Sequence, residues 1–150
     1  MPRPRASAGP HHLEKPQGEG RPARRGGGKL LEAITNRIVA ILRERYARGP
    51  VGAKTYVLDD IVLVVMRGSG FTALEQTIME SGDPGRVVEM RENFQHIMAA
   101  RYTQTIEELT GRKVLAFLSQ AHVQPDITTE TFLVDGPIEG LGAVEMTEPE

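Results

Sequence analysis

The chain has 150 residues, enough for one domain, and its net charge of −2 argues against strong nonspecific binding to nucleic acids. It contains no cysteine, which excludes disulfides, thiolate metal sites and cysteine nucleophiles and is compatible with a reducing compartment. The sequence has no run approaching the roughly 18 apolar residues that cross a bilayer. Arg24 and Arg25 precede glycines rather than the apolar region of an export signal. We therefore expect a cytoplasmic protein without membrane insertion.

Charge and composition divide the chain into three parts. Residues 1–28 hold six Lys/Arg against two Asp/Glu, are rich in Pro and Gly, and are predicted to form a disordered basic tail because they offer little apolar surface to bury. Residues 135–150 hold five Asp/Glu and no Lys/Arg and are predicted to form a loose acidic tail. Residues 29–134 are nearly neutral and are predicted to form the single folded domain.

The folded part is predicted to begin with a helix from 29 to 47, because apolar residues recur there at steps of three and four. Two strands follow, 53–58 and 61–67, joined by a tight turn at Asp59-Asp60. The second strand is apolar on both faces, which is typical of a central strand or of one covered on both sides.

A short helix is predicted over residues 73–80. Thr72 and Glu75 have the spacing of a capping box, in which each satisfies a free amide of the other. Ser81 and Gly82 interrupt the helical pattern before the next element begins.

The longest predicted element is a helix over residues 84–109. Asp83 suits the N-cap, proline suits the first helical position, and Gly111 suits a left-handed end. The apolar residues recur with helical spacing, which predicts one buried face that includes Val87, Met90, Phe94, Ile97, Met98, Tyr102, Ile106 and Leu109.

Two further strands, 113–122 and 127–134, are predicted to form a second hairpin around a Gln-Pro-Asp turn. The element order is therefore α-ββ-α-α-ββ. Two hairpins can share one four-stranded antiparallel sheet with the helices packed on it, so the expected fold class is two-layer α+β. Strands that are apolar on both faces of so small a domain also predict a homodimer.

Two arginines interrupt the predicted apolar face of the long helix. Arg101 shares that face with Phe94 and Ile97, and Arg91 lies at its edge. Either arginine can keep its charge in water while its stem covers apolar surface. Alternatively, a partly buried arginine is paired with an acid at a ligand or subunit boundary.

Residues 67–72 offer a candidate anion cradle, because a strand leads there into the start of a helix. A tight connection explains the same residues, and the complete P-loop pattern is absent. His122 and Asp126 form a candidate pair of metal ligands but show no third ligand at suitable spacing. We therefore predict no metal site, no cofactor and no catalytic residues.

The core resembles MpsC-like proteins, small bacterial domains named for a sodium-translocating, membrane-potential-generating system. The resemblance covers about residues 29–134 and excludes both tails. The motifs that carry it occur in order and are Arg48-Gly49-Pro50, Thr72-x-x-Glu75 followed by Gly82, Arg91, Ile106-Glu107-x-x-Thr110-Gly111-Arg112 and Phe117.

The resemblance implies a soluble accessory or regulatory protein, more in keeping with a non-enzymatic role, that associates with membrane complexes moving sodium or inorganic carbon. Such a protein would lie at the inner membrane face through a partner. The alternative is a sensor domain that binds a small anionic ligand. The residues predicted to contact a ligand or partner are Arg48, Arg91, Arg101, Arg112, Gly68, Ser69, Gly70 and Thr72.

Overall fold

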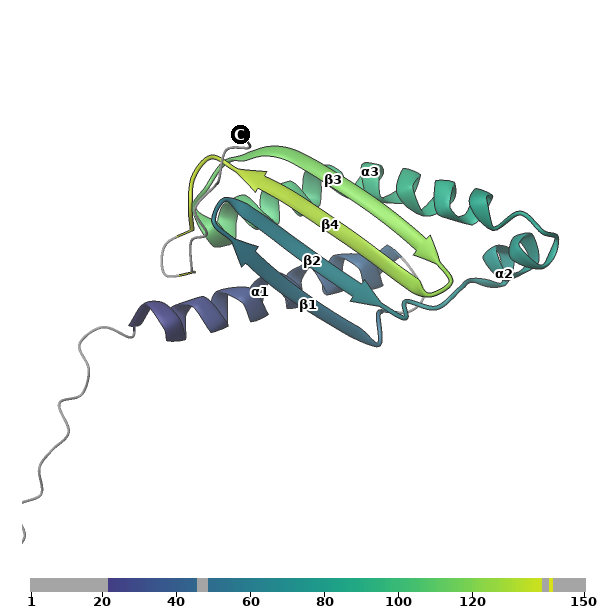
Figure 1. Ribbon diagram of the computed structural model, residues 1–150, viewed down its shortest axis with the longest axis horizontal. Helices are drawn as coiled ribbons and strands as arrows, with labels where there is room; N and C mark the ends of the chain where they lie inside the picture. The colour runs from purple at the N-terminus through teal and green to yellow at the C-terminus, as the bar shows by residue number, and fades with distance from the viewer. Residues whose placement is uncertain (1–21, 46–48, 139–140, 142–150) are drawn as a thin grey trace, which may run out of the picture.

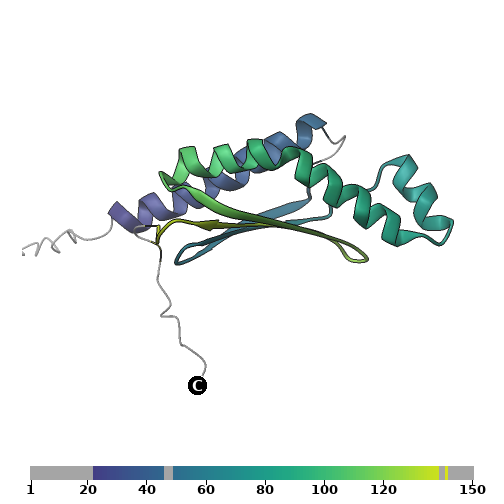
Figure 2. The same cartoon turned by 90° about the horizontal axis from the view of Figure 1, so that it is seen from above.

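The computed structural model describes residues 22–45, 49–138 and 141. Within these residues it contains α1 (Pro22–Arg45), β1 (Gly52–Leu58), β2 (Ile61–Arg67), α2 (Ala73–Glu80), α3 (Pro84–Thr110), β3 (Val114–Val123) and β4 (Asp126–Val134). The strands form one antiparallel sheet in the order β1-β2-β4-β3. Helices α1 and α3 lie across one face of this sheet, while α2 lies near its end (Figures 1 and 2). The predicted fold class, element order and two-layer architecture are confirmed.

The predicted caps of α2 and α3 are also confirmed. Asp83 accepts a hydrogen bond from the Arg86 amide at the start of α3, and Gly111 ends that helix with a φ of 67°. Thr72 and Glu75 form the reciprocal capping box of α2. These ends arise from local hydrogen bonds, which is why the sequence was sufficient to predict them.

The structure differs from the predicted boundaries at both ends of the domain. Helix α1 begins at Pro22 rather than at residue 29. The later start was predicted because residues 1–28 offer little apolar surface to bury, but proline suits a first helical turn. After β4 the chain remains attached to the fold, since Ile138 is buried and its amide donates to the Asp59 carbonyl. Residues 1–21 lie outside the described residues.

The core lies between the helices and the sheet. Alternate residues of each strand point toward α1 and α3, as the pleat requires. Tyr102 on α3 packs edge to face against Phe117 on β3, with 6.2 Å between ring centroids, and Phe117 contacts Phe132 on β4. The fully buried apolar side chains include Ile34, Ile38, Val62, Val64, Met66, Val87, Tyr102, Ile106, Phe132 and Val134.

The predicted buried face of α3 is wrong at Ile97, whose side chain is 72% exposed. The buried positions follow Val87, Arg91, Gln95, Met98 and Tyr102 instead. The prediction followed apolar residues alone, whereas part of the buried face is polar. The helix is therefore rotated relative to the predicted orientation, and this rotation creates the candidate site.

Candidate functional site

Arg91 lies at the centre of a buried ion-pair network. Its side chain is 4% exposed, and its Nε donates to Glu75 Oε2 over 2.8 Å. Its Nη1 donates to Asp126 Oδ1 over 2.7 Å, and its Nη2 donates to the Gly70 carbonyl. One guanidinium therefore joins α3 to α2, to the loop after β2 and to the β3–β4 turn.

The charges in this network stabilise one another. Burial by itself would lower the pKa of Arg91, but the hydrogen bonds and charges of Glu75 and Asp126 outweigh it and hold that pKa above its ordinary value. The guanidinium also lies over the ring of Phe71, 4.5 Å from its centroid. Arg91 is consequently a permanent cation whose charge is compensated inside the fold.

The loop predicted as an anion cradle holds carboxylates of the protein itself. Gly68 and Gly70 take φ angles of 67° and 79°, which glycine adopts without strain. The Gly70 amide donates to Asp126 Oδ2 over 2.9 Å, and the Gly68 amide donates to the Asp126 carbonyl over 2.9 Å. The Thr72 amide donates to Glu75 Oε1 over 2.9 Å. The amides of residues 70 and 72 thus bind carboxylates, and these belong to Asp126 and Glu75.

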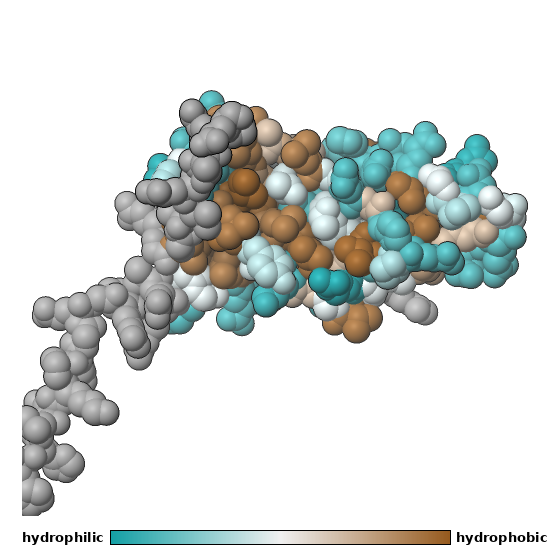
Figure 3. All heavy atoms as spheres, viewed as in Figure 1, coloured by the Kyte–Doolittle hydropathy of each residue, from teal (hydrophilic) through white to brown (hydrophobic). Residues whose placement is uncertain are grey.

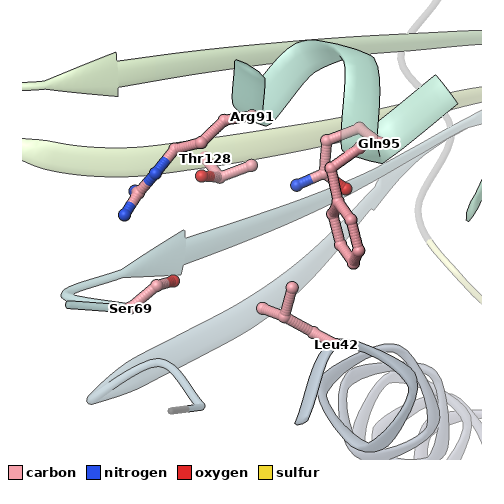
Figure 4. A pocket seen from close by; sticks show the side chains of 6 residues that line it. Leu42, Ser69, Arg91, Gln95 and Thr128 are labelled. Atoms are coloured by element: carbon pink, nitrogen blue, oxygen red, sulfur yellow. The ribbon is translucent and has the colours of Figure 1, made fainter. Parts of the chain in front are cut away.

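A narrow pocket opens beside the network. Arg91 and Gln95 reach from α3 toward Ser69 and Thr128, with Leu42 of α1 below (Figure 4). The space between these side chains is about 10 Å³, room for one water molecule. The buried Gln95 Oε1 has no hydrogen-bond partner among the described residues, which marks it as a position for such a water.

A second polar cluster lies under α3. Glu130 on β4 is fully buried, and neither of its carboxyl oxygens has a hydrogen-bond partner in the described part of the chain. Its cross-strand neighbour Ser119 and the overlying Tyr102 also carry buried hydroxyls without partners among these residues. Burial raises the pKa of Glu130 to about 8, and Ser119 is near enough to oppose this shift without adopting hydrogen-bond geometry. Burial, and secondarily the charge of Glu130, raises the pKa of Tyr102.

The structure separates the other predicted site residues. Arg91 lies together with the loop that contains Gly68, Ser69, Gly70 and Thr72. Arg101 instead forms a surface ion pair with Glu44 of α1, with 2.8 Å between Nη2 and Oε2 and 41% exposure of the arginine. The Arg112 guanidinium lies against the backbone of Gly136 at the other end of the sheet. Arg48 lies outside the described residues.

Sequence reasoning missed the acids that complete the site. Asp126 and Glu75 are distant from Arg91 along the chain, so only the tertiary structure shows that they meet it. Glu130 could have been found from the sequence, because strand alternation places it on the same face as Phe132 and Val134. An acid on a strand face otherwise apolar is a direct signal of a buried titratable group.

The described residues contain no group of three or more His, Asp or Glu side chains placed to hold a metal ion. The chemistry available at the site is carboxylate binding by a guanidinium and backbone amides. In the described part of the chain, no helix combines the length and apolar character needed to cross a membrane.

The fold and site define a small two-layer α+β domain whose helices and turn are held together by an internal arginine–carboxylate network. The family model described as "Na+-translocating membrane potential-generating system (MpsC)" matches residues 27–136. The chain therefore belongs to the MpsC family, as the resemblance indicated. Comparison with curated proteins and with solved structures gave no match.

Replacing Arg91 by methionine is expected to destabilise the fold by about 3–5 kcal/mol, because the buried Glu75 and the half-buried Asp126 would lose their cation. The matched control is Arg101→Met on the same helix, which removes an exposed ion pair and is expected to cost no more than about 1 kcal/mol. Urea unfolding of both variants measures the difference. Equal losses would contradict the structural importance of the Arg91 network.

Glu130 is expected to make stability fall as pH rises. Its folded pKa of about 8 exceeds the ordinary value of 4.5, so between these values the folded state binds a proton that the unfolded state has released. The stability loss is nearly complete by pH 8 and is on the order of 3–5 kcal/mol.

Glu130→Gln is expected to remove this pH dependence and to be more stable than the parent at pH 8, with little difference at pH 4. Urea unfolding across this range measures both curves. Glu89→Gln, at an exposed position of α3, is the control and should keep the parental slope. Parallel curves for the parent and the Glu130 variant would refute the buried neutral carboxyl.

Proposed function

We propose that the protein is a non-enzymatic accessory or regulatory component of a membrane system that translocates sodium or inorganic carbon. Membership of the MpsC family supports this proposal, since the family is described by a Na⁺-translocating, membrane-potential-generating system. The protein acts at the cytoplasmic face of the inner membrane, where it binds integral subunits of the transport complex. The absence of cysteine from the sequence is compatible with this location.

The geometry of the candidate site favours a structural role over a catalytic one. Arg91, Glu75 and Asp126 bind one another, so their charges serve to fasten α3, α2 and the β3–β4 turn. The adjacent pocket has room for one water molecule rather than for a metabolite. A domain of this kind can transmit binding at its surface without performing a reaction.

The test of this proposal is isolation of the tagged full chain from membranes of its own host after mild crosslinking. Integral subunits of an ion-transporting complex should be enriched over a tag-only control. Deletion of the gene should reduce the sodium-dependent membrane potential, and re-expression should restore it. Recovery without membrane proteins, together with an unchanged potential in the deletion strain, would contradict the proposal.

A second candidate function is the sensing of a small anion, and the binding of Asp126 favours it. Arg91 Nη1 and the Gly70 amide hold the two oxygens of the Asp126 carboxylate, as they would hold those of a carboxylate or phosphate ligand. Asp126 is itself 14% exposed, at a turn that lies at the surface. An anion that competes with Asp126 would release the β3–β4 turn and thereby report its presence.

For this second function, millimolar phosphate or acetate is expected to shift the melting temperature of the parent chain. Asp126→Ala should be destabilised and should regain several degrees with the same anions, because they replace the missing carboxylate. Asp60→Ala is the control and should show neither effect. Melting temperatures of parent and Asp126→Ala that do not respond to either anion would exclude a sensor for these anions.

A further inference from the structure

The face of the sheet opposite to the helices is apolar over one end and is not covered by any described residue. Figure 2 shows α1 and α3 on one side of the strands, and Figure 3 shows hydrophobic side chains gathered over part of the other side. Large apolar side chains remain accessible there, with exposures of 39% for Tyr56, 56% for Leu58 and 64% for Leu118. Apolar surface gathered in one patch marks an interaction surface.

This open face consists of the outward residues of β1, β2, β4 and β3. They form four cross-strand rows, which are Leu58–Ile61–Leu133–Ala116, Tyr56–Leu63–Thr131–Leu118, Lys54–Val65–Thr129–Gln120 and Gly52–Arg67–Ile127–His122. The first two rows are almost entirely apolar. The last two carry the basic and polar groups, so the face is apolar at one end and hydrophilic at the other.

The rows are complementary to their own rotated copy. A two-fold axis parallel to the strands, midway between β2 and β4, would place β1 of one copy over β3 of the other and β2 over β4. Large residues then face small ones, since Leu58 meets Ala116 and His122 meets Gly52. Lys54 would meet Gln120, so its charge does not face another cation.

The remaining pairs under the same rotation are also compatible. Ile61 would meet Leu133, and Tyr56 would meet Leu118, so these pairs join exposed apolar side chains of the two copies. Arg67 would lie over Ile127 at the hydrophilic end, where its charge can reach solvent. Face-to-face sheets commonly pack with nearly aligned strands, as this arrangement requires.

The open face is large enough for a small dimer interface. Four strands about 4.8 Å apart and seven paired residues of about 3.4 Å each give a footprint of roughly 450 Å² per copy. Side chains make the accessible area larger than the footprint, so a pair would bury on the order of 1,000 Å² or more, at the lower limit for specific interfaces.

We propose that the open face binds a second copy of this chain, forming a homodimer in which two sheets pack face to face about a two-fold axis parallel to the strands. The self-complementary rows and the available area support this occupant. The proposal is independent of the membrane association, since it leaves the outer surfaces of α1, α2 and α3 accessible to other partners.

The oligomeric state of the full chain tests the proposal. Sedimentation equilibrium should give twice the monomer mass of 16.5 kDa at micromolar concentrations. Leu118→Glu should raise the dimer dissociation constant roughly 100-fold, because a carboxylate would lose water inside an apolar interface. Ile97→Glu is the matched control, since Ile97 is at least as exposed as Leu118 but lies on α3 away from the open face, and its dimer should persist.

A charge pair tests the geometry. Tyr56→Lys and Leu118→Glu should each weaken the dimer, whereas the chain carrying both should recover much of the affinity, because lysine of one copy would face glutamate of the other. Within one chain these positions are three strand spacings apart, about 14 Å, so they cannot pair internally. Circular dichroism verifies that each variant is folded.

A monomeric parent chain would overturn the proposal, and the open face would then bind another partner or another part of the chain. An unchanged Leu118→Glu dimer, or loss of the dimer in Ile97→Glu, would also overturn it. Failure of the paired variant to recover affinity would overturn the proposed two-fold arrangement.

Discussion

Burying an unpaired guanidinium costs free energy comparable to the whole stability of a small domain, so Arg91 is buried only because it forms ion pairs with Glu75 and Asp126. These contacts join α3 to α2 and to the β3–β4 turn, and a further hydrogen bond joins Arg91 to the loop after β2. The β3–β4 turn and the loop after β2 are also joined directly, because the Gly68 amide donates to the Asp126 carbonyl and the Gly70 amide to the Asp126 carboxylate. The network thus holds α2, the loop and the turn around the first turns of α3.

The same constraint explains the orientation of α3. A helix with only apolar residues on its inner face would turn Ile97 toward the core. Here the inner face includes the buried side chains of Arg91 and Gln95, Arg91 is held there by Glu75 and Asp126, and Ile97 is left exposed. The inner face of α3 therefore has two parts. The buried ion pairs of Arg91 lie near the start of the helix, and the packing of Tyr102 lies nearer its end.

Glu130 is a buried ionisable group that, unlike Arg91, has no oppositely charged partner among the described residues. No cation meets it among the described residues, so burial favours its neutral form and raises its pKa toward 8. Arg91 keeps its charge by pairing, and Glu130 gives up its charge by protonation. The two solutions lie on the same helix–sheet interface, and they divide it into a charged end and a neutral middle. The open face, on the opposite side of the sheet, carries no buried charge among the described residues of its apolar end and is accessible to a partner.

The sequence by itself determined the elements, their order and the two-layer class, because these depend on local periodicity, caps and turns. Thr72, Asp83 and Gly111 act within a few residues of their own positions, and the alternation of Phe132 and Val134 is visible in β4. The burial of Glu130 was within reach of the same alternation. The tertiary structure alone decided that Asp126 and Glu75 meet Arg91, that Arg101 pairs with Glu44 at the surface, and that α3 turns Ile97 outward. Those outcomes depend on contacts between residues far apart in the chain, whose charges must be matched when water is removed.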